Sequence, residues 1–104
     1  LEADAAVDQA ENGGATPLYI ACQKGHLEIA RLLLEAGAAI NQAREDGATP
    51  LFIACVMGQL EIARLLLEAG AAINQAREDG ATPLFIACQL GHLECAQLLL
   101  EAGA

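Results

Sequence analysis

The sequence predicts an all-α fold: a solenoid of stacked antiparallel helix pairs with short hairpin-like loops. The tripeptide Thr-Pro-Leu begins at Thr16, Thr49 and Thr82, so it recurs at a spacing of 33 residues. Residues 36–68 and 69–101 differ at five of 33 positions. Such a period marks repeated units that bury their apolar faces only by stacking on one another. Of the 104 residues, 55% are hydrophobic but only 3% aromatic, which favours a core of Leu, Ile and Ala.

The first helix of each unit has clear start and stop signals, which the middle unit illustrates. Gly47 suits a sharp turn, because glycine adopts backbone conformations that other residues avoid. Thr49 can cap the helix start with its hydroxyl, and Pro50 fits the first helical position, where no donor is needed. Gly58 should end the helix after about two turns. Its apolar face is expected to comprise Leu51, Ala54 and Cys55.

The second helix should begin at Glu61, since an acid is favourable near a helix N-terminus. Gly70 is placed to end it in a left-handed conformation. Residues 71–79 then form an extended, turn-rich connection to the next unit. Neither helix is long enough to be stable alone. The predicted buried face consists of Ile62, Leu65, Leu66 and Ala69.

Residues 46–55, DGATPLFIAC, together with residues 58–71, GQLEIARLLLEAGA, resemble the ankyrin repeat. The resemblance covers the whole chain. It departs from the family's His-x-Ala-Ala pattern in two places, because an aromatic residue replaces the His and a Cys replaces the second Ala. In the family that His ties neighbouring loops together, so we expect ring packing to replace it here. The aromatic positions are Tyr19, Phe52 and Phe85, and the cysteine positions are Cys22, Cys55 and Cys88.

The resemblance implies one domain over residues 1–104. Residues 1–11 match the tail of a preceding repeat and its loop, and residues 12–44, 45–77 and 78–104 form repeats 1, 2 and 3. The third ends after its second helix, and neither end carries a polar capping repeat. The sequence therefore fits either a fragment of a longer array or an engineered repeat protein. The near identity of the last two units favours the second origin. Apolar end faces predict end-to-end self-association.

The charge balance excludes several classes of partner. Five Lys and Arg against 14 Asp and Glu give a net charge of −9. No basic patch for nucleic acid can be assembled from five dispersed cations, and an anionic membrane surface is disfavoured for the same reason. No apolar run reaches the roughly 20 residues of a membrane span. The N-terminal residues show no secretion signal.

The cysteines are predicted to be structural. Three recur with the period, and Cys95 stands where the other units have Ile29 and Ile62. Packed helices lie about 10 Å apart, whereas a disulfide needs Cα atoms closer than about 7 Å. We therefore expect four reduced, buried thiols in a reducing, cytoplasmic compartment. A metal site at Cys88, His92 and Cys95 is the alternative, but Gly91 breaks the helix that would align them. No metal or cofactor is expected.

No catalytic constellation is expected either, so the chain is predicted not to be an enzyme. It contains no Ser, and its glutamates repeat with the period as scaffold positions do. Glu28 with Arg31, and Glu61 with Arg64, have the spacing of surface ion pairs.

The candidate binding surface comes from comparing units. The two residues before the helix-turn Gly change in every unit, from Gln23-Lys24 to Val56-Met57 to Gln89-Leu90, while their neighbours stay fixed. The resemblance implies that this slot and the loop tip form a concave partner-binding face. Ile20, Ile53 and Ile86 should border it. The candidate residues are Asn12, Gly13, Ala15, Gln23, Lys24, Glu45, Asp46, Ala48, Val56, Met57, Glu78, Asp79, Ala81, Gln89 and Leu90.

This surface has an apolar centre at Val56, Met57 and Leu90 and acidic loop tips, which is how protein interfaces are laid out. The predicted function is a protein-binding module with an unknown protein partner. One alternative is that Val56 and Met57 only pack between units; another is a structural or engineered scaffold without a partner. The resemblance also makes Asn41 and Asn74 candidates for hydroxylation, although Ala39 and Ala72 stand where an acid is usual.

Overall fold

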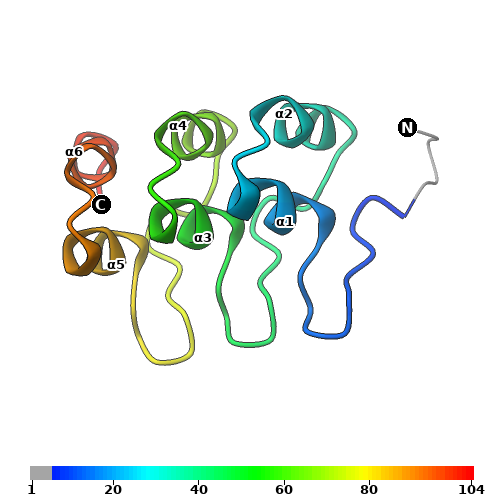
Figure 1. Ribbon diagram of the computed structural model, residues 1–104, viewed down its shortest axis with the longest axis horizontal. Coiled ribbons are helices and arrows are strands. Elements are labelled where there is room, and N and C mark those ends of the chain that lie inside the picture. The colour runs from blue at the N-terminus through cyan, green and yellow to red at the C-terminus, as the bar shows by residue number, and fades with distance from the viewer. Residues whose placement is uncertain (1–5) are drawn as a thin grey trace.

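The computed structural model describes residues 6–104, which contain six α-helices and no strand (Figure 1). The predicted match of residues 1–5 to the tail of a preceding helix lies outside the described residues. Consecutive helices form three pairs joined by loops. The helices are α1 (Pro17–Lys24), α2 (Leu27–Glu35), α3 (Pro50–Val56), α4 (Leu60–Glu68), α5 (Pro83–Leu90) and α6 (Leu93–Glu101).

The predicted helix starts are confirmed at all three Thr-Pro-Leu sites. The hydroxyls of Thr16, Thr49 and Thr82 accept hydrogen bonds from the backbone N–H three residues later, at 3.2, 3.1 and 3.1 Å. These bonds satisfy a donor that the helix itself leaves unpaired. Gly25 and Gly91 end α1 and α5 in the left-handed conformation, with φ of 79° and 77°.

The second helices differ slightly from the prediction. Each begins at a Leu, one residue before the predicted Glu, which then lies in the first turn. The predicted stop at Gly70 is confirmed, with φ of 95°. Ala69 was wrongly expected in the core: it caps the C-terminus of α4 and is exposed. Ala63 is completely buried instead.

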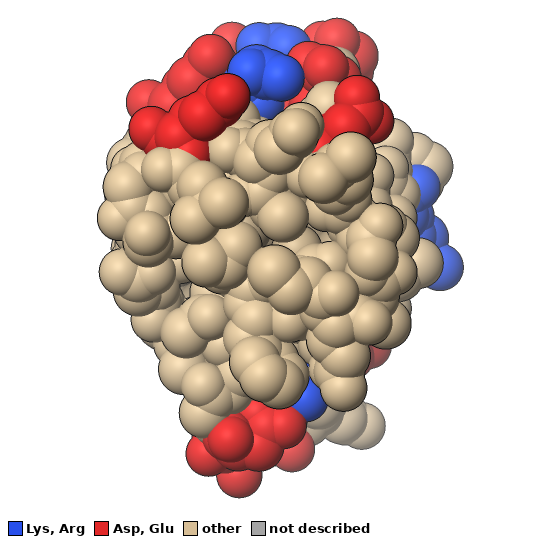
Figure 2. All heavy atoms as spheres, turned by 90° about the vertical axis from the view of Figure 1, so that its left-hand side faces the viewer, with Lys and Arg blue, Asp and Glu red and all other residues tan. Residues whose placement is uncertain are grey.

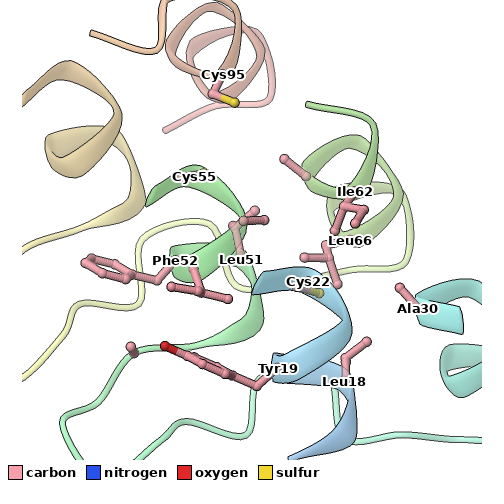
Figure 3. Packing of buried hydrophobic residues seen from close by; sticks show 14 of the residues in the cluster. Leu18, Tyr19, Cys22, Ala30, Leu51, Phe52, Cys55, Ile62, Leu66 and Cys95 are labelled. Carbon is pink, nitrogen blue, oxygen red and sulfur yellow. The ribbon is translucent and has the colours of Figure 1, made fainter. Parts of the chain in front are cut away.

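The helices form two layers. α1, α3 and α5 pack side by side in one layer, α2, α4 and α6 form the other, and the loops project from the first layer (Figure 1). The core lies between the layers and between successive pairs, where Leu18, Leu51 and Leu66 are at most 1% exposed (Figure 3). Each pair therefore depends on its neighbours for burial.

The cysteines are buried as predicted, with one exception. Cys22 and Cys55 are 0% exposed and Cys95 is 2% exposed. Cys88 is exposed on α5: within residues 6–104 no helix packs against this side of α5, as α3 packs on α1 and α5 packs on α3. All four thiols are free. Burial raises the pKa of Cys22 and of Cys55 to about 12.

The proposed alternative of a metal site at Cys88, His92 and Cys95 finds no support. Within residues 6–104, no three His, Cys, Asp or Glu side chains converge as metal ligands would. None of the described helices is both long enough and apolar enough to span a membrane.

Candidate functional site

The variable positions lie in a row where the first helices end. Because α1, α3 and α5 pack side by side in register, Lys24, Met57 and Leu90 occupy matching places along the layer. Met57 and Leu90 are each 48% exposed. Val56 is half-buried and packs against the core. The alternative of packing between units therefore fits Val56 but not Met57.

The turns behind this row are held in place by contacts between units. The His92 ring hydrogen-bonds through Nε2 to the Val56 carbonyl oxygen at 3.0 Å. The same ring lies so close to Gly58 that a Cβ added there would be 3.0 Å from it. Gln59 fills the matching space beside Gly25. The next unit therefore fixes the turns beside Lys24 and Met57, whereas nothing described lies within 4 Å of a Cβ added at Gly91, beside Leu90.

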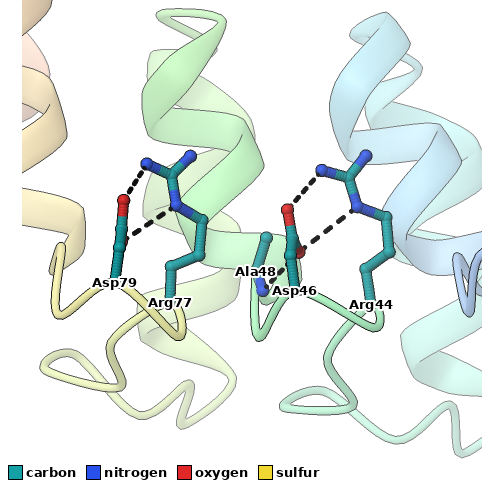
Figure 4. Close-up of polar contacts among 5 residues, drawn as sticks. All are labelled: Arg44, Asp46, Ala48, Arg77 and Asp79. Carbon is teal, nitrogen blue, oxygen red and sulfur yellow. Dashed lines mark hydrogen bonds and ion pairs between the residues drawn. The ribbon is translucent and has the colours of Figure 1, made fainter.

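The second and third loop tips are each organised by an arginine and an aspartate (Figure 4). Arg44 donates two hydrogen bonds to Asp46, the shorter at 2.7 Å, and Arg77 does the same to Asp79, the shorter at 2.6 Å. Asp46 also accepts from the backbone N–H of Ala48 at 3.0 Å. The hydrogen bond from its arginine holds the pKa of Asp46, and likewise that of Asp79, below the ordinary value.

These aspartates are therefore engaged within their own loops. Glu45 and Glu78 are exposed beside them and belong to none of the ion pairs found among residues 6–104. The free acidic charge of the loop tips thus comes from the two glutamates. Asp46, Arg77, Glu78 and Asp79 line a shallow depression between the second and third loops.

The arginines have a second role that the sequence did not reveal. The Arg44 guanidinium lies 5.1 Å from the centre of the Tyr19 ring, and that of Arg77 lies 4.9 Å from the centre of the Phe52 ring. Such contacts are attractive because the ring face is electron-rich. Both rings are 1% exposed. Each arginine thus holds the loop that follows a helix pair against the first helix of that pair. The signal for this contact in the sequence was that the arginine and the ring both recur every 33 residues.

A ladder of hydrogen bonds also joins successive loops. The backbone N–H of Glu45 donates to the Gly13 carbonyl at 3.1 Å, and that of Glu78 donates to the Asp46 carbonyl at 2.8 Å. The Asn41 side-chain oxygen accepts from the backbone N–H of Ala72 at 2.9 Å, and Asp8 plays the same part for Ala39. Asn41 is therefore a connector between units. Sequence reasoning missed this role.

The structure corrects the candidate surface at three alanines. Ala15, Ala48 and Ala81 are 4%, 1% and 7% exposed and belong to the buried hydrophobic core. Their side chains are unavailable to a partner. Among the bordering isoleucines, Ile20 is half-buried, while Ile53 and Ile86 are each 6% exposed. The remaining candidates are at least partly exposed: Asn12, Gly13, Gln23, Lys24, Glu45, Asp46, Val56, Met57, Glu78, Asp79, Gln89 and Leu90.

The acids on the second helices lie apart from this surface. Arg31 pairs with Glu28 at 3.4 Å and Arg64 with Glu61 at 3.7 Å, as predicted from their spacing. All four side chains are largely exposed, so these pairs contribute little to stability.

A family model described as ankyrin repeats, three copies, matches residues 1–77 and again residues 36–104. Together the two matches cover the chain. A search of the curated proteins finds no match.

Proposed function

The chain belongs to the ankyrin-repeat family, and from this we propose that it is a non-enzymatic module that binds a protein partner. The proposed contact surface is the row of first-helix ends together with the loop tips. Members of this family are generally protein-interaction modules and are typically not enzymes. Binding would require no cofactor, because the surface acts by shape, apolar contact and charge.

One observation carries the proposal: the exposure of Met57 and Leu90 on a rigid surface. Large apolar side chains that lie together on a surface often mark contact sites. The hydrogen bond from His92 fixes the turn behind Met57, and the Arg77 contact with Phe52 holds the following loop against α3. A partner would thus meet a preorganised surface, which lowers the ordering cost of binding. Glu45 and Glu78 supply a charged rim.

The test compares three baits in partner capture from a cell lysate: the wild type, Met57→Glu and Gln97→Glu. Gln97 is exposed on α6, in the other helix layer, so it adds the same charge away from the surface. We expect a protein that the wild type and Gln97→Glu retain and Met57→Glu loses. Equal retention by all three baits would refute this surface, and capture of nothing would favour the alternative of a scaffold without a partner.

We also propose that copies of the chain associate end to end, and that the chain works in a reducing, cytoplasmic compartment. Exposed apolar side chains at the α5–α6 end, including Leu93 at 67%, support the first proposal. Four free thiols support the second, because unpaired cysteines persist where disulfides are disfavoured.

A further inference from the structure

We propose that this association is head to tail: the end face formed by α5 and α6 docks on the end face formed by α1 and α2 of a second copy. The docking would repeat the interface that joins successive units inside the chain. This inference rests on the proposed end-to-end association and adds its geometry. The occupant of each end face is therefore a second copy of the same chain.

The α5–α6 end face presents side chains that are covered elsewhere in the stack. Phe85 is 57% exposed, whereas Tyr19 and Phe52 at the matching positions are each 1% exposed. Leu93 and Leu100 are 67% and 59% exposed. Figure 2 shows the middle of this face as a broad area without charged residues, with acidic and basic groups along its edges. This end face thus corresponds to the side of a helix pair that the next pair covers inside the stack.

The α1–α2 end face presents the complementary half. Ile29 is 51% exposed, whereas Ile62 and Cys95, which take its place in the next two units, are each 2% exposed. Pro17, Ile20 and Ile29 line an open hollow of about 380 Å³ on this side. Inside the chain, Ile62 and Cys22 belong to the same buried core (Figure 3). Ile29 of a second copy would take the place of Ile62 in an equivalent core over the exposed Cys88.

Polar groups set the register between copies. Inside the chain, the Asp46 carbonyl, the Asn41 side chain and the Val56 carbonyl each bond to the following unit. The equivalent acceptors on the end face are the Asp79 carbonyl, the Asn74 side chain and the Gln89 carbonyl. The equivalent groups on the second copy are the Asn12 N–H, the Ala6 N–H and the His26 ring.

One position does not match. Arg44 and Arg77 each cover the ring that lies 33 positions before the ring of the next helix pair, but the loop before α1 has Glu11 in place of the arginine and Gly13 in place of the paired aspartate. A carboxylate over the face of Phe85 is unfavourable, because the ring face is itself negative. Association should therefore be weak. An interface between two different faces does not close on itself in a dimer, so the chains should grow with concentration.

Complementation of two variants tests this geometry by sedimentation or light scattering. Phe85→Glu blocks one end face and Ile29→Glu blocks the other, and both residues are more than half exposed, so the fold should persist in circular dichroism. Each variant alone should remain a monomer of 10.8 kDa, and an equal mixture should reach about twice that mass. If either variant still associates by itself, or the mixture stays monomeric while the wild type associates, the head-to-tail geometry is wrong. A wild type that stays monomeric at millimolar concentration refutes end-to-end association itself.

A gain of affinity provides an independent test. The double variant Glu11→Arg, Gly13→Asp installs the arginine and aspartate of the other loops in the first one. A Cβ at Gly13 meets only the flexible Glu11 side chain, at 3.5 Å, so the aspartate fits. Glu35→Gln, at an exposed helix end, is the control because it reaches the same net charge. We expect association about two- to fivefold tighter than in the control, as one cation–ring contact provides. Association no tighter than in the control would overturn the register.

Discussion

Within residues 6–104, no group hydrogen-bonds to the Tyr19 hydroxyl, although the residue is 1% exposed. An unsatisfied buried hydroxyl costs about 1–3 kcal/mol. Tyr19→Phe should remove this cost while keeping the ring under Arg44. Phe52 already shows this arrangement, since it is equally buried and lies under Arg77. We therefore expect the substitution to raise the free energy of unfolding by about 1 kcal/mol or more.

The measurement is thermal and urea unfolding followed by circular dichroism at neutral pH. For a domain of this size, about 1 kcal/mol corresponds to a rise in Tm of roughly 4–8 °C. Phe52→Tyr is the matched control, because it places the same hydroxyl at the equivalent buried position. It should lower stability by a similar amount. If Tyr19→Phe is neutral or destabilising, the hydroxyl has a partner in solution and the argument from burial fails.

The remaining predictions concern a cap, the thiols and the binding surface. Thr49→Ala should cost about 1–2 kcal/mol in urea unfolding, and Thr82→Ala less, because the Thr49 bond is buried and the Thr82 bond is exposed. Burial raises the pKa of Cys22 and Cys55 from 9.0 to about 12, so the unfolded chain loses these protons first. The free energy of unfolding should therefore fall as pH rises from 9 toward 12. The double variant Cys22→Ala, Cys55→Ala should show a flatter dependence, and the measurement is Tm as a function of pH. Met57→Glu should change the free energy of unfolding by about 0.5 kcal/mol or less, since the residue is exposed; a larger loss would place Met57 in the core.

The helix pairs could be predicted from the sequence because their signals are local. Thr49 caps α3, which begins at the next residue. Gly70 follows the end of α4 and has a left-handed backbone conformation. Such features depend on a few neighbouring residues and need no knowledge of the stack. The error at Ala69 has a local cause as well. Helical spacing assigned it to the buried face, but it lies at the C-cap, where the helix ends and the side chain leaves that face.

The ring contacts and the loop ladder could not be predicted in the same way. Arg44 is 25 positions from Tyr19, and only the folded loop brings the guanidinium over the ring. The loop alanines show a related difficulty. Ala48 is small enough for either a surface or a tight internal contact, so its identity alone could not place it.

Burial in this fold is a property of the interface between units, and the exposed ends show why. Cys22, Cys55 and Cys88 occupy the same position in their units, yet the first two are buried and the third is exposed. Tyr19, Phe52 and Phe85 follow the same pattern. The 33-residue period therefore showed that these residues occupy equivalent positions in the repeat, but it could not show that each position is buried. A residue that forms core inside the stack is exposed at its end, so the apolar end faces and the exposed Met57 need different explanations. Met57 is exposed although units flank it on both sides, whereas Phe85 lies on α5, against which no further helix pair packs within residues 6–104. This difference separates a surface suited to a foreign partner from one suited to a further repeat unit.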